Sequence, residues 1–145
     1  MNLSRAIAIG RRERFLVVVS TVRSDSTVQS SVVNAGMLQH PGTGGEVLGF
    51  VTYGQAKLRN LRARPQVTVT FRSGGDWASV EGRAQIIGPD DPQPGFDHER
   101  LRLLRREVFT AAGGTHDDWA AYDEVMDSQR RAVVLIEPTR VYSNG

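Results

Sequence analysis

The strongest constraint on the fold of this chain is a set of six short runs rich in β-branched and aromatic residues. Turn-forming residues separate these runs. β-Branched and aromatic side chains favour extended backbone because they pack well on a pleated surface. The predicted strands span 15–22, 28–38, 47–52, 67–71, 77–87 and 132–142. Short turns join most neighbours, which favours antiparallel pairing. The pattern predicts a mainly β fold with flanking helices (α+β), a six-stranded antiparallel barrel whose closure would remove exposed edges.

Three helices are predicted between these strands. A short basic helix spans 55–65, between the third and fourth strands, and Pro65 ends it. A second helix spans 98–112, and a third follows Gly113-Gly114 and carries Trp119 and Tyr122. The chain has 145 residues, enough for one core, and no internal boundary stands out. We therefore expect a single domain over 1–145.

Composition excludes several classes of function. The chain has no cysteine, so disulfides, thiolate metal sites and cysteine nucleophiles are impossible. Its formal net charge is only +2 and no aromatic residues interleave with the basic helix, which argues against nucleic-acid binding. No run is long enough to cross a membrane, and the first residues lack the order of a signal peptide. We expect a cytoplasmic protein without membrane insertion.

The basic helix carries the strongest functional signal. It follows a strand and a tight turn, so its first N–H groups and the positive end of its dipole favour an anion. Lys57 and Arg59 add full charges beside that start. The segment predicts a phosphate clamp. A solvated basic helix is the alternative, because charged runs usually lie on exposed faces.

No side-chain catalytic constellation is apparent elsewhere. His40, His98 and His116 stand in unrelated contexts, and no ligand spacing matches a metal site. The aspartates after His116 fit a helix start better than a metal centre. We predict neither catalytic side chains nor metal ligands. A bound redox cofactor would then carry the chemistry, while the protein supplies binding and orientation.

Three segments together resemble a known family. They are residues 28–36, residues 56–65, and the stretch that begins at Asp76-Trp77 and includes residues 80–84. The tail from His116 to Tyr142 agrees with them. The chain is similar to the actinobacterial deazaflavin (coenzyme F420)-dependent oxidoreductases of the FMN-binding split β-barrel superfamily, which includes pyridoxamine 5'-phosphate oxidase. The resemblance implies a six-stranded split β-barrel homodimer with cofactor at the subunit interface.

The resemblance also implies a cofactor site. Lys57 matches the lysine that contacts the cofactor phosphate, and the neighbouring helix residues match positions near the phosphate and tail. Trp77, and with it Arg131, would come from the partner chain. The implied cofactor-binding residues are Ser31, Val32, Val33, Thr52, Gln55, Ala56, Lys57, Arg59, Asn60, Trp77 and Arg131.

The implied reaction is transfer of a hydride from reduced coenzyme F420 to an electron-poor small molecule such as a quinone, an enone or a tetrapyrrole. FMN is the alternative cofactor, and Arg59, Arg62 and Arg64 favour the deazaflavin because they could line a groove for its anionic tail. A non-catalytic F420 carrier or sensor, an FMN-binding protein and a haem binder on the same barrel stay open. Residues 1–14 are shorter than the helix that relatives usually carry, so the substrate is not implied.

Overall fold

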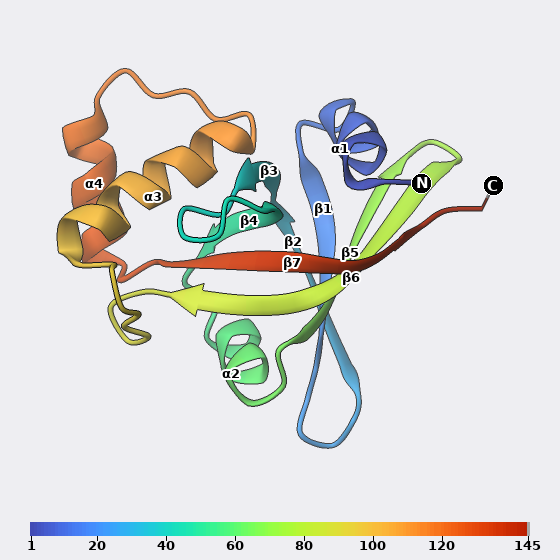
Figure 1. The fold of residues 1–145 in the computed structure, drawn as a ribbon, viewed down its shortest axis with the longest axis horizontal. Helices are drawn as coiled ribbons and strands as arrows, with labels where there is room; N and C mark the ends of the chain where they lie inside the picture. Colours follow the sequence, from blue (N-terminus) through green and yellow to red (C-terminus); the bar gives the residue numbers. More distant parts are fainter. Residues whose placement is uncertain (145) are drawn as a thin grey trace.

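The computed structural model describes residues 1–144, in which seven strands form one antiparallel sheet with four helices around it (Figure 1). The helix α1 covers one end of the sheet, and α3 and α4 lie at the other end (Figure 1). The strands are β1 (Leu16–Val22), β2 (Val28–Asn34), β3 (Gly36–Gln39), β4 (Glu46–Thr52), β5 (Gln66–Ser73), β6 (Asp76–Ile87) and β7 (Ala132–Tyr142). The helices are α1 (Leu3–Arg11), α2 (Gln55–Ala63), α3 (His98–Ala111) and α4 (Trp119–Ser128).

The sheet has seven strands, so the expected count of six is wrong, and it is not a closed barrel. Its order is β2-β1-β5-β6-β7-β4-β3. The predicted strand 28–38 is divided at Ala35, which is fully buried and whose N–H donates to Phe15 O at 3.0 Å. Before Ala35 the chain pairs with β1, and after it the chain pairs with β4. One nearly continuous stretch therefore supplies both edges of the sheet.

The helix α1 was not predicted from the sequence. Asn2 caps it by accepting a hydrogen bond from the backbone N–H of Arg5 at 2.9 Å. Its buried face, which includes Leu3, Ala6 and Ile7, joins the same apolar core as β5 and β6. The apolar residues of this face, which also include Ile9, lie in a short segment with Arg5 and Arg11, so the stripe covers little more than two helical turns.

Two apolar clusters hold the elements together. One fills the concave side of the sheet around Phe50, Val69 and Val80. The other joins α3, through Leu104 and Val108, to the opposite face of the sheet. Both faces of β7 are thus covered from Ala132 to Ile136, which explains its unbroken apolar run.

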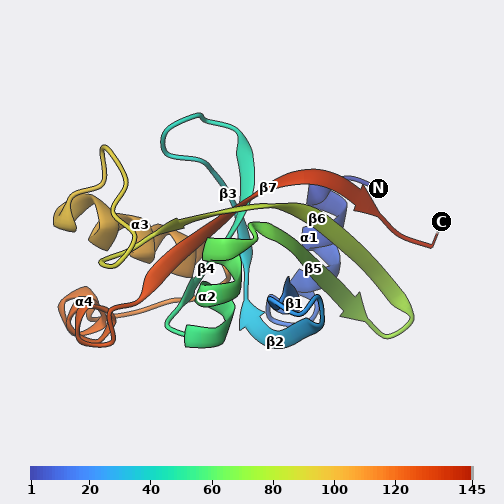
Figure 2. The same cartoon turned by 90° about the horizontal axis from the view of Figure 1, so that it is seen from below.

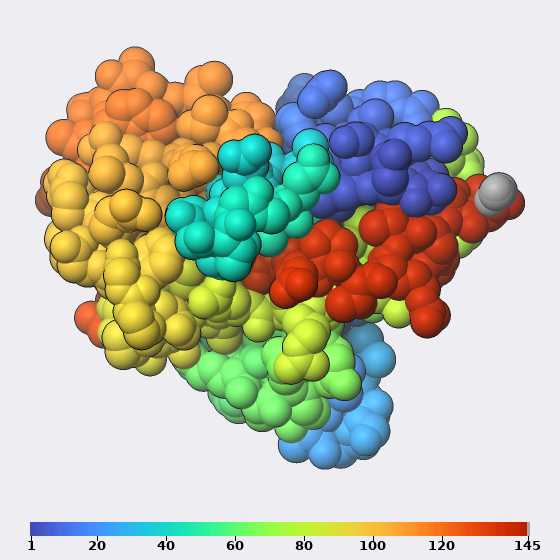
Figure 3. Space-filling model, in the orientation of Figure 1, coloured from blue at the N-terminus to red at the C-terminus, as the bar shows by residue number. Residues whose placement is uncertain are grey.

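Two further features complete the fold. The helix α2 packs against β1 on the side away from α3 (Figure 2). On the face shown in Figure 3, the 40–45 loop lies between α1 and the α3–α4 pair. None of the helices in residues 1–144 has the length and apolarity needed to cross a membrane.

Gly36 fixes the close approach of β3 to α3. A Cβ atom added there would lie 2.2 Å from Ala111 O, a backbone atom that cannot rotate away. We expect Gly36→Ala to lower the free energy of unfolding by about 1–3 kcal/mol, because the helix must shift to relieve the clash. Gly75→Ala is the matched control, since open space surrounds that position. Urea unfolding of both variants measures the difference, and equal stabilities would contradict the prediction.

Candidate functional site

A cavity of about 710 Å³ lies between β2, the end of β4, the start of α2 and the α3–α4 pair. This volume is typical of a site for an organic ligand or cofactor. The residues from β2, β4 and α2 include Val32, Val33, Thr52, Gly54 and Lys57. The residues from the helices and the loop between them include Val108, Phe109, Ala112, His116, Ala121, Tyr122, Val125 and Met126.

Lys57 is the charged group of the wall formed by β4 and α2. Its side chain is folded back against the start of its own helix, so that Nζ would lie only 3.5 Å from a Cβ atom at Gly54. Nζ is also 5.8 Å from the centre of the Phe50 ring. Gly54 N donates to Thr52 Oγ1 at 3.1 Å, which fixes the turn before the helix. As a result Lys57 is only 7% exposed.

The surroundings of Lys57 oppose its charge. Burial lowers the pKa of its ammonium, and no nearby carboxylate raises it again. The first turn of α2 has no acidic residue, and no side chain caps its free N–H groups. The positive end of the helix dipole acts at the same place. A buried cation beside a positive helix end is unfavourable by itself, and an anion bound at this wall would offset both positive charges.

The second wall is aromatic. Phe109, His116 and Tyr122, here called the aromatic wall, line the cavity, and Trp119 lies behind them. Ring centres within the group are 4.9–6.4 Å apart, mostly edge to face, an arrangement that adds stabilisation beyond area burial. Burial raises the pKa of Tyr122 to about 12, so its hydroxyl stays neutral. That hydroxyl donates to Arg105 O at 3.1 Å.

Arg131 brings a second cation to the cavity, from the same chain. Its guanidinium carbon lies 4.2 Å from the centre of the Tyr53 ring, a cation–π contact. Its Nε donates to Gln129 Oε1 at 2.8 Å. The pair of Tyr53 and Arg131 therefore links the end of β4 to the start of β7 at the rim of the cavity.

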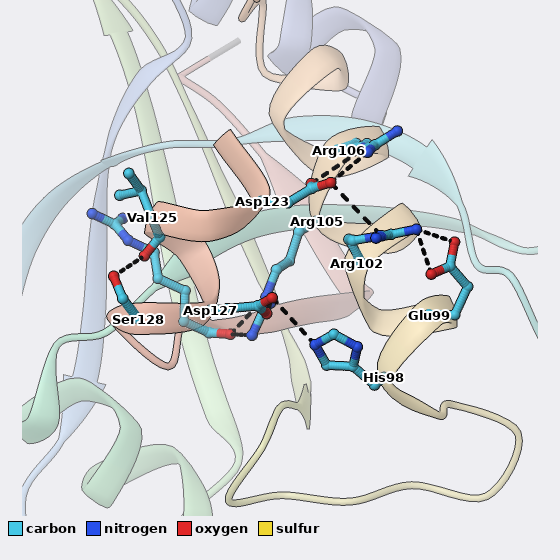
Figure 4. A network of polar contacts seen from close by, with 10 residues as sticks. His98, Glu99, Arg102, Arg105, Arg106, Asp123, Val125, Asp127 and Ser128 are labelled. Atoms are coloured by element: carbon cyan, nitrogen blue, oxygen red, sulfur yellow. Dashed lines mark hydrogen bonds and ion pairs between the residues drawn. The ribbon is translucent and has the colours of Figure 1, made fainter. Parts of the chain in front are cut away.

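The helix α4, which carries Tyr122 of the aromatic wall, is held to α3 by ion pairs (Figure 4). Arg105 is 1% exposed, and it donates to Asp127 Oδ1 at 2.6 Å and to Arg131 O at 2.6 and 2.9 Å. Arg106 pairs with Asp123, and its hydrogen bonds keep the pKa of that carboxyl below its usual value. These contacts position one wall of the cavity.

The structure brings five of the eleven predicted cofactor-binding residues to this cavity: Val32, Val33, Thr52, Lys57 and Arg131. Three further residues lie on the outer part of α2, where Gln55, Ala56 and Arg59 are exposed. Asn60 is buried, and its side chain donates to Thr21 Oγ1 at 3.0 Å, so it joins α2 to β1.

Two predicted residues lie elsewhere. Ser31 has a buried Oγ with no hydrogen-bond partner in residues 1–144, and it is not among the cavity residues. Trp77 lies at the far end of β6, where it packs edge to face on Tyr142 with ring centres 6.2 Å apart. Ser143 Oγ donates to Trp77 O at 2.6 Å.

Two of the three arginines expected to line a tail groove have other partners. Arg62 forms two hydrogen bonds with Asp91, at 2.7 and 2.8 Å. Arg64 Nε donates to Val22 O at 2.9 Å. A smaller cavity of about 320 Å³ nevertheless has Arg23, Arg59 and Arg64 on its walls. Arg62 is not among the residues of this cavity, and the groove for an anionic tail stays a prediction.

The sequence reasoning missed the aromatic wall. Phe109 lies on the second predicted helix and His116 at the start of the third, so no spacing rule connects them. Tyr122 lies on the third predicted helix, where an aromatic residue usually packs in the core. One sequence signal for their contact was available. Gly113-Gly114 lies between Phe109 and His116 in the sequence, and a tight turn there brings the two helices that it joins close together.

Comparisons with known proteins agree with this architecture. A family model described as pyridoxamine 5'-phosphate oxidase matches residues 5–145. A solved structure of an F420 reductase aligns with a TM-score of 0.59 and 22% identity, covering 89% of this chain and 90% of that chain. The split-barrel class expected for the fold, antiparallel and mainly β with flanking helices, is thereby confirmed.

Two further solved structures have the same fold with different ligands in their names. A pyridoxamine 5'-phosphate oxidase-related, FMN-binding protein from Nostoc punctiforme aligns with a TM-score of 0.60 and 15% identity, covering 96% of this chain and 80% of that chain. A haem storage protein from Vibrio cholerae aligns with a TM-score of 0.55 and 15% identity, covering 99% and 95%. Identities this low show the fold alone.

Proposed function

The chain belongs to the pyridoxamine 5'-phosphate oxidase family, and we propose that it is an oxidoreductase that uses the deazaflavin coenzyme F420 to reduce an electron-poor small molecule. The observation that carries the proposal is Lys57, a buried ammonium at the open start of α2 that no carboxylate neutralises. A phosphate group would supply the missing negative charge. The residues present therefore fit a phosphorylated cofactor.

The rest of the cavity suits a planar ring system. Val32 and Val33 offer apolar contacts from β2, and the aromatic wall offers more from the helices. When bound, the reduced deazaflavin supplies the hydride. The chain's own residues would hold the phosphate at Lys57, orient the ring between β2 and the helices, and keep water from much of the cavity.

The arginines beside α2 favour the deazaflavin over FMN. Coenzyme F420 carries an anionic tail beyond its phosphate, and Arg23, Arg59 and Arg64 form a cationic surface for it. FMN is the second candidate, because Lys57 would hold its phosphate equally well. A carrier or sensor role would use the same contacts without turnover.

We also propose that the chain works as a homodimer. Val32 is 63% exposed beside the cavity, and its strand β2 is an edge strand of the sheet. Val28 on β2 and Val18 on the neighbouring β1 are exposed as well. Apolar side chains at a sheet edge are usually covered by a partner. A second copy would bury this surface and close the cavity, and its Trp77 would be the residue that the family resemblance assigns to the partner chain.

Titration with both cofactors tests the function. We expect oxidised F420 to bind with micromolar or better affinity and FMN at least tenfold more weakly, because FMN lacks the tail that Arg59 would contact. Sedimentation of the same samples should give twice the mass of one chain. Tighter binding of FMN, yellow colour retained on purification, or a Soret band would overturn the F420 assignment. Bound F420 without turnover on quinones and enones would leave a carrier.

A further inference from the structure

His116 lies where it can touch a second ligand in the cavity. It follows α3 and precedes α4, and its ring packs against Phe109, Trp119 and Tyr122. Its Nδ1 accepts a hydrogen bond from Asp118 N at 3.0 Å. A neutral imidazole whose Nδ1 accepts must carry its proton on Nε2. The structure thus fixes the tautomer and leaves Nε2–H as a hydrogen-bond donor.

The only polar side chains that α3, α4 and the loop between them bring to the cavity are those of His116 and Tyr122, and Tyr122 OH already donates to Arg105 O. Asn34 lies on β2, where one N–H of its amide donates to Arg14 O at 2.9 Å. Val125 and Met126 add only apolar contacts. Among the described residues on this side of the cavity, His116 is therefore the side chain that can recognise an oxygen atom.

We propose that His116 is a catalytic residue that binds the oxygen of the hydride acceptor, which makes the acceptor a planar carbonyl compound, a quinone or a conjugated enone. This inference rests on the proposed function. It goes beyond the sequence analysis, which predicted no catalytic side chain. Aromatic surfaces around one fixed N–H donor match a flat apolar molecule with a carbonyl group on its rim.

The reaction balances as follows. A new C–H bond forms between the transferred hydride and a carbon of the acceptor, whose conjugated π electrons move to the carbonyl oxygen. The bound reduced deazaflavin would supply the two electrons as the hydride and would release one ring N–H proton to water, which balances the proton that the product takes up. Nε2–H of His116 stabilises the charge that develops on the oxygen, and water supplies the proton that completes the product. The His116 side chain is 32% exposed, so water reaches it, and it keeps its own proton.

The test compares two ligands that differ in their carbonyl groups. Equilibrium dialysis measures binding of menadione and of 2-methylnaphthalene to the protein, with and without oxidised F420. Menadione and oxidised F420 are both oxidised and cannot react with each other. We expect His116→Phe, which keeps an aromatic ring, to weaken menadione binding about threefold to tenfold and to leave 2-methylnaphthalene unchanged. His116→Gln, which restores an N–H donor, should recover part of the loss. The chain has no cysteine with which the quinone could react.

A spectroscopic readout separates recognition from a structural role. The infrared carbonyl stretch of bound menadione should lie at lower frequency in the wild type than in His116→Phe, because a hydrogen bond weakens the C=O bond. His98→Gln, an exposed histidine outside the cavity, is the control and should match the wild type. Equal menadione affinity and an unshifted stretch in His116→Phe would overturn the proposal.

The two proposals fail in different ways. If F420 does not bind but menadione still depends on His116, the cofactor assignment fails and the carbonyl site stands. If F420 binds and its affinity depends on Lys57, while menadione ignores His116, only the present inference fails.

Discussion

Lys57→Met will weaken binding of coenzyme F420 roughly tenfold to a hundredfold and will stabilise the cofactor-free protein. The loss follows from removing one charge-assisted contact to phosphate, worth about 1.5–3 kcal/mol. The cofactor-free protein becomes more stable because the substitution removes a buried ammonium. Desolvation lowers the pKa of that ammonium, and no carboxylate among residues 1–144 neutralises it. Replacing such a charge by an apolar side chain of similar length is expected to add about 1–2 kcal/mol to the free energy of unfolding.

The opposite signs of these effects make the prediction specific. Fluorescence titration of F420 and urea unfolding of the cofactor-free protein measure them separately. Arg59→Met is the matched control, because Arg59 is an exposed cation on the same helix. It should leave the stability unchanged and weaken F420 less than the Lys57 variant does. Undiminished affinity in Lys57→Met, or a less stable cofactor-free protein, would remove the basis of the proposed function.

Arg105→Met will destabilise the protein by about 2–4 kcal/mol. The buried guanidinium donates to Asp127 and to the backbone carbonyl of Arg131, so that carbonyl would lose its partner and Asp127 would keep only His98. Breaking a buried ion pair usually costs about 3–5 kcal/mol of unfolding free energy. The expected loss is smaller here because the Asp127 side chain is 37% exposed to water. The damage should concentrate in α4, which Arg105 ties to the start of β7.

Hydrogen exchange locates this effect. In Arg105→Met the amides of α4 should exchange much faster, while those of β5 and β6 should change in proportion to global stability alone. Arg130→Met is the control, because its ion pair with Asp90 is exposed on both sides and should contribute nothing measurable. Equal unfolding curves for the two variants would show that the network in Figure 4 does not hold the cavity wall.

Much of the fold could be predicted because local patterns and tertiary structure agree. The predicted strand 132–142 begins with the apolar run 132–136, and that part of β7 is buried on both faces. The division at Ala35 could not be predicted, because residues 28–38 have uniform strand character and only tertiary contacts decide that β2 and β3 pair with different neighbours. Helix α1 was missed for a similar reason, since it is short and its apolar residues are buried only by packing on the sheet.

The site shows the same limit. Lys57 was recognisable because its chemistry depends on a local feature, the start of a helix after a strand. Arg62 was not separable from Arg59 in sequence, since its partner Asp91 lies 29 residues away. His116 gave no local signal, and its role as a donor depends on the packing of α3 against α4. The position of Lys57 at a helix start could be predicted, whereas contacts between distant elements could not.

The place of β7 in the sheet has a consequence for how the protein is made. Last of the seven strands to leave the ribosome, β7 inserts between β6 and β4. Until residues 132–142 emerge, the nascent chain holds two incomplete ladders, each with an open edge. Assembly of the whole sheet therefore waits for residues 132–142, and a chain truncated before Ala132 would expose two edges suited to aggregation.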